Sequence, residues 1–553
     1  MTRSTRSVTP AGRRRGMRGL GLVALAPVLA LIALLCWAFA SPVGGSPDDD
    51  YHLTSTWCAV ERAGLCEPGS EADSRLVPEA VAAPACYAFD QDESAACQGD
   101  DFGADSEPRV ETSRGNFSGG YPPVFYAVTN LLASPDIQVS ALLLRALNIL
   151  LFVGLSTAVF ALVQAARRQQ LVLTWMITTV PLTAYLVASN NPSAWAVTGV
   201  GIAWPALMGY FDEVGRRRVA LGALFAVGTL MAAGSRGDSA VYAVLAIAAV
   251  VLLRFRKEPG FWKLLLLPAA AILVALVLFS MAGQTAAGVG GFTGPVRSGG
   301  EVLPGSDSSG ATGTSESSEA DAGADRTAAL SGIALVAYNL LAVPELWAGA
   351  LGSWPLGWFD TPVPSLVGLV GIAAFAVIGF AGLRGMWWRK LVVVIGAVLV
   401  LWLLPVWVLS RGGSVVGEAV QPRYLLPVLV LVAAALLTTR HAARPLAFGR
   451  LQLIVVAAAL SVTHLIALHF VMRRYVTGND ALAPSLDAGA EWWWTLPVGP
   501  NVVWAVGSLA FAGCLAVLVR ELLRLSSAAS LDTALAVSPA LVDAPKTRDA
   551  ARG

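Results

Sequence analysis

Apolar stretches recur along this chain, and short segments rich in arginine and lysine separate them. The first runs from about Leu20 to Ala40, and a helix of that length crosses the ~30 Å of hydrocarbon in a bilayer. Hydrophobic residues make up 56% of the chain and charged residues only 14%, which is more apolar surface than a soluble core buries. The sequence therefore predicts an all-α, polytopic integral membrane protein. We expect about twelve transmembrane helices, near 20–40, 139–166, 171–188, 193–211, 218–234, 239–254, 261–283, 365–383, 389–409, 422–438, 451–472 and 501–520.

The basic residues predict the orientation of these spans. Six arginines precede the first span, and basic clusters follow the spans that end near positions 166, 211 and 254. Because positive charge stays on the cytoplasmic side, we expect a cytoplasmic N-terminus (1–18), a transmembrane domain (19–525) and a cytoplasmic tail (526–553). The apolar segment 329–350 would upset this alternation if it crossed the membrane. We therefore expect 329–364 to form an interfacial segment and an external loop.

A polar segment, 41–138, follows the first span and is expected to be a large external loop. It holds four of the six cysteines, an even number in the one large loop that the topology exports to an oxidising compartment. We expect two disulfides, and the simplest of the three connectivities pairs Cys58 with Cys66 and Cys86 with Cys97. A second polar segment, 284–328, has almost no bulky apolar side chain and is expected to be a disordered external loop.

The acidic run S-P-D-D-D-Y-H at 46–52 lies just beyond the first span. Three adjacent carboxylates repel one another, so placing them beside a bilayer is costly unless they are solvated or bind a ligand. Asp48–Asp50 are therefore the first candidates for a functional site. The alternative is a solvated loop that only marks topology. His52 is expected to be a surface histidine, and Arg145, inside its span, is expected to extend to the outer headgroups.

No aspartate or glutamate lies inside the twelve expected spans. Proton- and cation-coupled carriers usually hold a carboxylate near the midplane, so this pattern argues against an ion-driven transporter. The net charge of +1 and the lack of a basic patch interleaved with aromatics argue against nucleic-acid binding. Charge gathers instead at the outer boundary, which suits a substrate that is half lipid and half polar. These residues are Asp48, Asp49, Asp50, His52, Arg114, Arg236, Asp238, Asp360, Arg411, Glu418, Arg423, Arg473 and Arg474.

Three motifs resemble those of a bacterial family. P-D-D-D-Y-H at 47–52 resembles the P-D-E-x-x-H signature of the membrane proteins grouped as domain of unknown function 2142. G-W-F-D-T-P-V-P at 357–364 and Q-P-R-Y-L-L-P at 421–427 resemble that family's later motifs. The family is similar to the GT-C superfamily of membrane glycosyltransferases, which use polyprenyl-phosphate sugars and carry an acidic pair in the first external loop. The resemblance implies a GT-C-like fold for 19–525. Asp49 stands where the family usually has Glu, which keeps the charge.

Residue chemistry agrees with the roles that the resemblance implies. Inverting sugar transfer needs a base near the anomeric carbon, and Asp48 or Asp49 would serve. It also needs cations at the phosphate leaving group, for which Arg423 is the first candidate. We expect further substrate contacts from Asp50, His52, Arg236, Asp360, Tyr424, Arg473 and Arg474. No cofactor is required, although a divalent cation held by Asp49, Asp50 and His52 is possible.

The sequence therefore predicts a glycosyltransferase in a bacterial cytoplasmic membrane, with its active site on the outer face. It would move a sugar from a polyprenyl phosphate to a cell-envelope glycan or lipid. Two alternatives stay open. A transporter or flippase of an envelope lipid would use the same outer charges as a headgroup vestibule and move its lipid intact. A non-catalytic envelope-assembly protein would need none of these charges.

Overall fold

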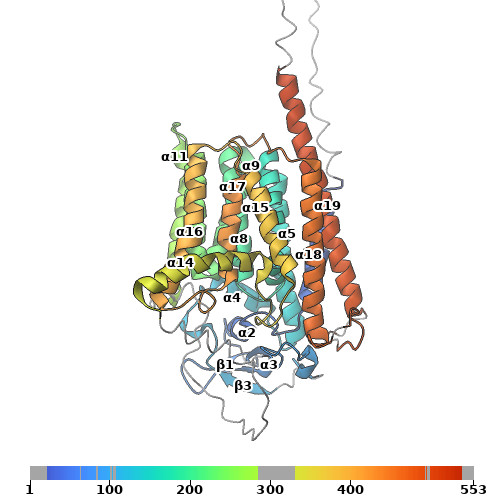
Figure 1. Cartoon of the computed structure of the whole chain (residues 1–553). Coiled ribbons are helices and arrows are strands. Elements are labelled where there is room, and N and C mark those ends of the chain that lie inside the picture. Colours follow the sequence, from blue (N-terminus) through green and yellow to red (C-terminus); the bar gives the residue numbers. More distant parts are fainter. Residues whose placement is uncertain are drawn as a thin grey trace, which may run out of the picture.

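A computed structural model describes residues 21–537, except 63, 83–84, 100–101, 104–107, 284–329, 482, 492–493 and 495–497, and the side chains of 528–537. The expected N-terminal segment 1–18 and the expected loop 284–328 lie outside the described residues, as does the tail from 538 onward. Figure 1 shows long helices standing side by side, with a layer of short elements covering one end.

Two sets of elements make up the described chain. The helices outside the loop layer are α1 (Leu25–Phe39), α5 (Ile137–Leu162), α6 (Ala165–Thr178), α7 (Pro181–Val187), α8 (Ser193–Asp212), α9 (Gly215–Ser235), α10 (Gly237–Arg254), α11 (Phe261–Leu264), α12 (Leu266–Met281), α14 (Gly332–Ala348) with a π-helical turn (Gly349–Ser353), α15 (Ser365–Ala381), α16 (Trp388–Gly412), α17 (Pro422–Leu437), α18 (Arg450–Val476) and α19 (Pro500–Val537). The loop layer, defined as the chain between α1 and α5, contains α2 (Asp49–Trp57), β1 (Glu67–Pro68), β2 (Arg75–Pro78), α3 (Glu79–Ala82), β3 (Arg109–Thr112) and α4 (Val124–Thr129), with 3-10 turns at Ala95–Gln98, Asn116–Ser118 and Asn130–Leu132.

Nine described helices are long and apolar enough to cross a membrane. They are α5, α8, α9, α10, α11 with α12, α14 with the π-helical turn that follows it, α16, α18 and α19. Helices α6 and α7 together would be a tenth, but a bend of 99° separates them, so the span expected at 171–188 is broken. Val180, between the two helices, is extended (ψ 168°), as the residue before Pro181 tends to be. The shorter apolar helices α1, α15 and α17 occupy three other expected spans.

Helix α14 lies across the bundle and not along it (Figure 1). It packs against α16 and α17, and Trp402 of α16 donates a hydrogen bond to the carbonyl oxygen of Leu340 (2.8 Å). Its other face leaves Ile333 and Leu341 more than three-quarters exposed. A helix with one packed face and one exposed apolar face, lying across its neighbours, has the orientation of a helix in the plane of a membrane interface.

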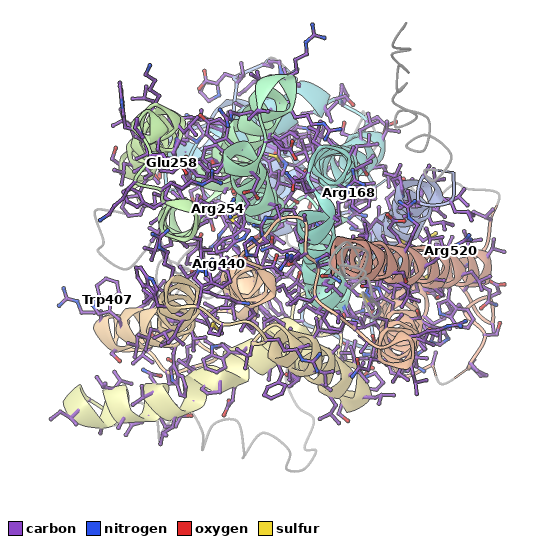
Figure 2. The ribbon with its side chains drawn as sticks, turned by 90° about the horizontal axis from the view of Figure 1, so that it is seen from above. Arg168, Arg254, Glu258, Trp407, Arg440 and Arg520 are labelled. Atoms are coloured by element: carbon purple, nitrogen blue, oxygen red, sulfur yellow. A yellow bond between two sulfur atoms is a disulfide. The ribbon has the colours of Figure 1, made fainter. Side chains whose placement is uncertain are left out.

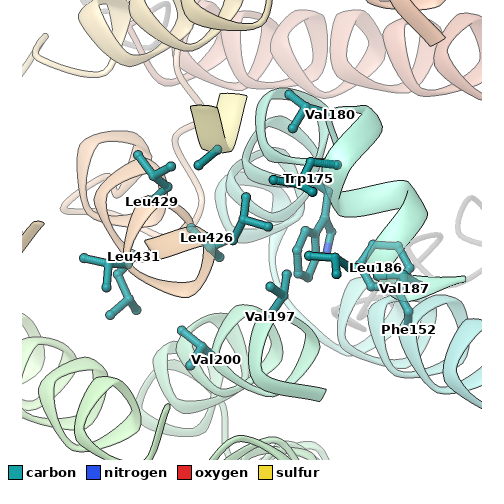
Figure 3. Close-up of a cluster of buried hydrophobic side chains, with 14 of the residues drawn as sticks. Phe152, Trp175, Val180, Leu186, Val187, Val197, Val200, Leu426, Leu429 and Leu431 are labelled. Atoms are coloured by element: carbon teal, nitrogen blue, oxygen red, sulfur yellow. The ribbon is translucent and has the colours of Figure 1, made fainter. Parts of the chain in front are cut away.

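Helix α8 is the centre of the bundle, because 94% of the residues in its 18-residue apolar stretch are buried. It approaches α9 closely through small residues. A Cβ on Gly199 would lie 2.5 Å from the carbonyl oxygen of Gly228, so neither position has room for a larger side chain. Figure 3 shows the apolar cluster beside it, in which Trp175 lies among side chains from α5, α7, α8 and α17.

The loop layer contains the two expected disulfides, Cys58–Cys66 and Cys86–Cys97, which confirms that prediction. It also contains a small antiparallel sheet in the order β1-β2-β3, in which Leu76 pairs with Glu111. The sequence analysis did not predict the sheet, because strands of two to four residues carry too little periodic pattern.

Two arginines, Arg167 and Arg254, connect helix ends at the opposite face of the bundle. Arg167 at the start of α6 binds Asp212 at the end of α8 (3.0 Å), and Arg254 at the end of α10 binds the same carboxylate. The two guanidinium groups also donate to the carbonyl oxygens of Thr439 and Arg440, just after α17. Figure 2 views this end and shows Arg254 and Arg440 between the helices. Three helix C-termini, which carry partial negative charge, are thereby neutralised together.

Asp212→Ala is expected to destabilise the fold by about 3 kcal/mol or more, because it leaves the buried guanidinium of Arg167 and the partly buried one of Arg254 without their carboxylate. The measurement is thermal unfolding of the detergent-purified protein. Glu258→Ala is the control, because Glu258 is exposed at the same end. Equal unfolding temperatures for Asp212→Ala and Glu258→Ala would contradict the prediction.

Candidate active site

A buried arginine holds the loop that follows α1. Arg145 on α5 donates to the carbonyl oxygens of Ala38 (2.6 Å), Ser41 (2.7 Å) and Pro42 (2.7 Å). Its side chain is completely buried, so the expectation that Arg145 reaches the lipid headgroups is wrong. The last carbonyl groups of a helix have no partner within it, and a guanidinium satisfies them while it neutralises the helix dipole.

Side chains from distant parts of the chain fix the rest of this loop, residues 43–47. They come from the loop layer, the α14–α15 connection, α18 and the α7–α8 connection. The hydrogen bonds run from Tyr87 to the carbonyl of Val43 (2.7 Å), from Trp358 to Gly44 (2.7 Å), from Tyr475 to Gly45 (3.1 Å) and from Asn191 to Pro47 (3.1 Å). The bundle therefore sets the position of the acidic run that follows.

Asp48 lies between two arginines at the start of α2. Its Oδ2 is 2.5 Å from Nη2 of Arg423, and its Oδ1 is 3.2 Å from Nη2 of Arg114. Burial alone would raise the pKa of Asp48, but the positive charge of Arg423 and its neighbours outweighs burial and lowers the pKa. The side chain keeps 19% exposure, compared with 4% for Asp50. Asp48 is therefore the most accessible member of the acidic run.

Asp49 faces the interior of the fold. It is completely buried, and one carboxylate oxygen accepts the backbone N–H of Ser46 at 3.1 Å. The other oxygen has no hydrogen-bond partner among the described residues. Burial raises the pKa of Asp49 to about 7, although the positive charge of Arg145 opposes this. Asp49 is thus partly protonated near neutral pH.

Asp50 and His52 have partners of their own. Asp50 binds Nε and Nη2 of Arg114. His52 is 1% exposed, with Nδ1 2.9 Å from the hydroxyl oxygen of Tyr126, so the expectation of a surface histidine is wrong. Burial lowers the pKa of His52 to about 3, which keeps the ring neutral. Within the described part of the chain, no three His, Cys, Asp or Glu side chains come together as metal ligands, and Asp49, Asp50 and His52 form no such group.

Two arginines lie over the ring of Tyr424. The guanidinium carbons of Arg236 and Arg423 are 4.2 Å and 5.1 Å from the ring centre. Both oxygens of Asp238 bind Arg236 at 3.0 Å. Arg423 uses Nη2 for Asp48 and for the Tyr424 hydroxyl, whereas its Nε and Nη1 are buried without a hydrogen-bond partner in the described structure. These two donors are available for an anion, because buried donors gain most from a charged partner.

A small, partly open pocket lies beside Arg423, and we call it the Arg423 pocket. The loop before α2, α7, the α14–α15 connection and the start of α17 meet here. The lining residues are Pro47, Leu182, Tyr185, Trp354, Pro355, Leu356, Gly357, Phe359, Gln421, Pro422 and Arg423. The pocket thus joins parts of all three sequence motifs.

Three other residues were expected to contact the substrate. Asp360 and Arg474 bind each other, and Arg473 is not among the residues that line the Arg423 pocket. Arg474 binds Asp360 at 2.9 Å and donates to three carbonyl oxygens of the loop layer, at positions 87, 90 and 93. It therefore attaches the loop layer to α18. Arg473 lies over the ring of Phe470, 4.8 Å from its centre.

The sequence analysis did not predict the roles of Arg114 and Arg145. Arg114 appeared only among the outer charges, because 64 residues separate it from Asp50 and no pattern relates the two. Arg145 did carry a signal. An ionisable residue inside an apolar span is costly and is usually placed there for a purpose, so burial with a polar partner was the better interpretation.

A family profile described as "Predicted membrane protein (DUF2142)" matches residues 31–432. The chain belongs to this family. The matched region includes the acidic run, the 357–364 motif and Arg423, and it ends before Arg474. With its apolar helices, this DUF2142 member is a multi-pass membrane protein. Among solved structures, it is similar to ArnT from Cupriavidus metallidurans, crystallised with undecaprenyl phosphate. The sequence identity is 13%, the TM-score is 0.41, and the match covers 94% of this chain and 81% of that one. No curated protein matches.

In this DUF2142 protein, Asp49→Asn is expected to flatten the dependence of stability on pH. The pKa of Asp49 rises from 3.8 to about 7 on folding. The folded state therefore holds the proton more tightly, which stabilises it fully below about pH 4, and this stabilisation is lost as the pH rises through about 7. Thermal unfolding of purified protein across this range is the measurement. Asp136→Asn, at an exposed helix N-cap, is the control. Parallel curves for wild type and Asp49→Asn would contradict the prediction.

Proposed function

We propose that this protein is a glycosyltransferase that moves a sugar from a polyprenyl phosphate to a cell-envelope acceptor at the outer face of the cytoplasmic membrane. One observation carries the proposal. Arg423, which lines the pocket, binds Asp48 through Nη2, while its buried Nε and Nη1 have no hydrogen-bond partner among the described residues. A carboxylate and a free anion-binding group therefore lie side by side, as transfer from a phosphate donor requires.

In the proposed reaction, the donor phosphate binds Arg423 in competition with Asp48. Asp48 then loses part of the positive charge that lowers its pKa, and it becomes a stronger base. It takes the proton of the acceptor hydroxyl while that oxygen forms a bond to the anomeric carbon. The bond from this carbon to the phosphate oxygen breaks, and the lipid phosphate leaves with the negative charge. Arg423, with Arg236 close by, stabilises that charge.

Asp49 has a positioning role in this proposal. Its burial keeps it away from the acceptor, and its contacts are with the loop that Arg145 holds. A second cavity, lined by apolar side chains of α10, α16 and α17 together with Tyr424, adjoins the site on the bundle side. An apolar wall next to an anion-binding arginine suits a lipid phosphate.

Asp48→Asn is expected to reduce sugar transfer about 10²-fold or more, because it removes the base, and Arg423→Gln is expected to do the same by removing the phosphate contact. Asp49→Asn is expected to retain more activity than either. The measurement is release of free undecaprenyl phosphate from undecaprenyl-phosphate hexose in membranes that contain each variant. Asp136→Asn is the control for expression.

Two outcomes would contradict the proposal. Undiminished release by Asp48→Asn would exclude this residue as the base. Movement of the lipid across the bilayer with its sugar still attached, and no release in the wild type, would favour a flippase.

A further inference from the structure

We propose that the Arg423 pocket selects an uncharged, hydroxyl-bearing sugar on the donor lipid through Gln421 and Trp354. This inference rests on the proposed function and names its substrate class. It follows from hydrogen-bonding groups in the pocket that the reaction scheme does not use, and from the charge balance around them.

Two neutral polar groups of the pocket lining lack hydrogen-bond partners in the described part of the chain. Oε1 of Gln421 is a buried acceptor, and Nε1–H of Trp354 is a buried donor. A buried polar group without a partner costs roughly 1–3 kcal/mol. Two such groups in one pocket indicate that a polar ligand supplies their missing hydrogen bonds. A hydroxyl group both donates and accepts, so neighbouring sugar hydroxyls fit this pair.

The described lining of the pocket offers no carboxylate as a counter-ion for an ammonium group on the sugar. Asp360, next to a lining residue in the sequence, binds Arg474. Asp48 binds Arg114 as well as Arg423, so it keeps one arginine when a phosphate takes Arg423. An ammonium group would therefore meet the guanidinium of Arg423 without compensation. Arg236 is occupied by Asp238, so a sugar carboxylate would have to compete with the phosphate for Arg423. An uncharged sugar avoids both costs.

The α14–α15 connection gives the pocket a fixed aromatic rim. Backbone hydrogen bonds in both directions join Leu356 and Thr361 (3.0 and 3.3 Å), and a Cβ on Gly357 would lie 2.6 Å from the Tyr475 hydroxyl, so the turn is tightly packed. Within it, Phe359 has a left-handed backbone (φ 67°), which is strained for a bulky residue. Phe359 lines the pocket, and the residue as a whole is 40% exposed. A partly exposed aromatic ring at the pocket offers an apolar surface to the C–H face of a sugar.

Binding to purified protein tests the inference, with four probes: undecaprenyl phosphate alone and the same lipid carrying glucose, glucosamine or glucuronic acid. Wild type is expected to bind the glucose lipid about fivefold more tightly than the bare lipid phosphate, or more. Glucosamine and glucuronic acid should give no such gain. Gln421→Met keeps a side chain of similar size, and Trp354→Phe keeps an aromatic ring, but each removes one hydrogen-bonding group. Each variant should lose most of the extra affinity for the glucose lipid and bind undecaprenyl phosphate as the wild type does.

Two control variants and one variant of the phosphate contact separate a failure of this inference from a failure of the proposed function. Gln452→Met and Trp402→Phe make the same changes where the side chains already have partners, and both should keep the gain. Arg423→Gln should weaken binding of all four lipids. Equal binding of the glucose and glucosamine lipids, or an intact gain in Gln421→Met and Trp354→Phe, would overturn the inference and leave the proposed function standing. Failure of wild type to bind undecaprenyl phosphate would overturn the proposed function as well.

Discussion

The pairing of buried arginines with aspartates is the interaction on which this site depends. Burying a charge without a partner costs several kcal/mol, so each of these side chains requires its neighbour. The ion pairs of the described site join four arginines to four aspartates: Arg114, Arg236, Arg423 and Arg474 with Asp48, Asp50, Asp238 and Asp360. A phosphate entering this set breaks the balance, and the accessible Asp48 is the member best placed to give up its arginine.

The same pairing joins segments that are far apart in the sequence. Arg423 connects the start of α17 to the start of α2, and Arg474 attaches α18 to the loop layer. At the opposite face, Asp212 holds two arginines of other helices. Removing one partner of a buried ion pair is costly, so these pairs hold the joined segments together at both ends of the bundle.

The sequence predicted the helices and the two disulfides well, because each depends on local pattern or on spacing within one loop. The span length of apolar runs is a property of single segments. The bend before Pro181 arises because the residue before a proline disfavours helical geometry. Hydropathy alone does not predict such a bend. The buried states of Arg145 and His52 depend on which distant segments pack over them, and no local pattern records that. The same holds for Arg114. Its partners Asp48 and Asp50 precede the three-stranded sheet in the sequence, whereas Arg114 follows it.

Helix α14 leads directly into the turn that lines the Arg423 pocket, and it lies across the bundle with an apolar face exposed. For the proposed lipid-phosphate donor, this layout means arrival from the side, within one leaflet. The search is then two-dimensional, and the quantity that governs encounter is the surface density of the lipid and not its bulk concentration. The rate at which the pocket fills would accordingly respond to the fluidity and composition of that leaflet.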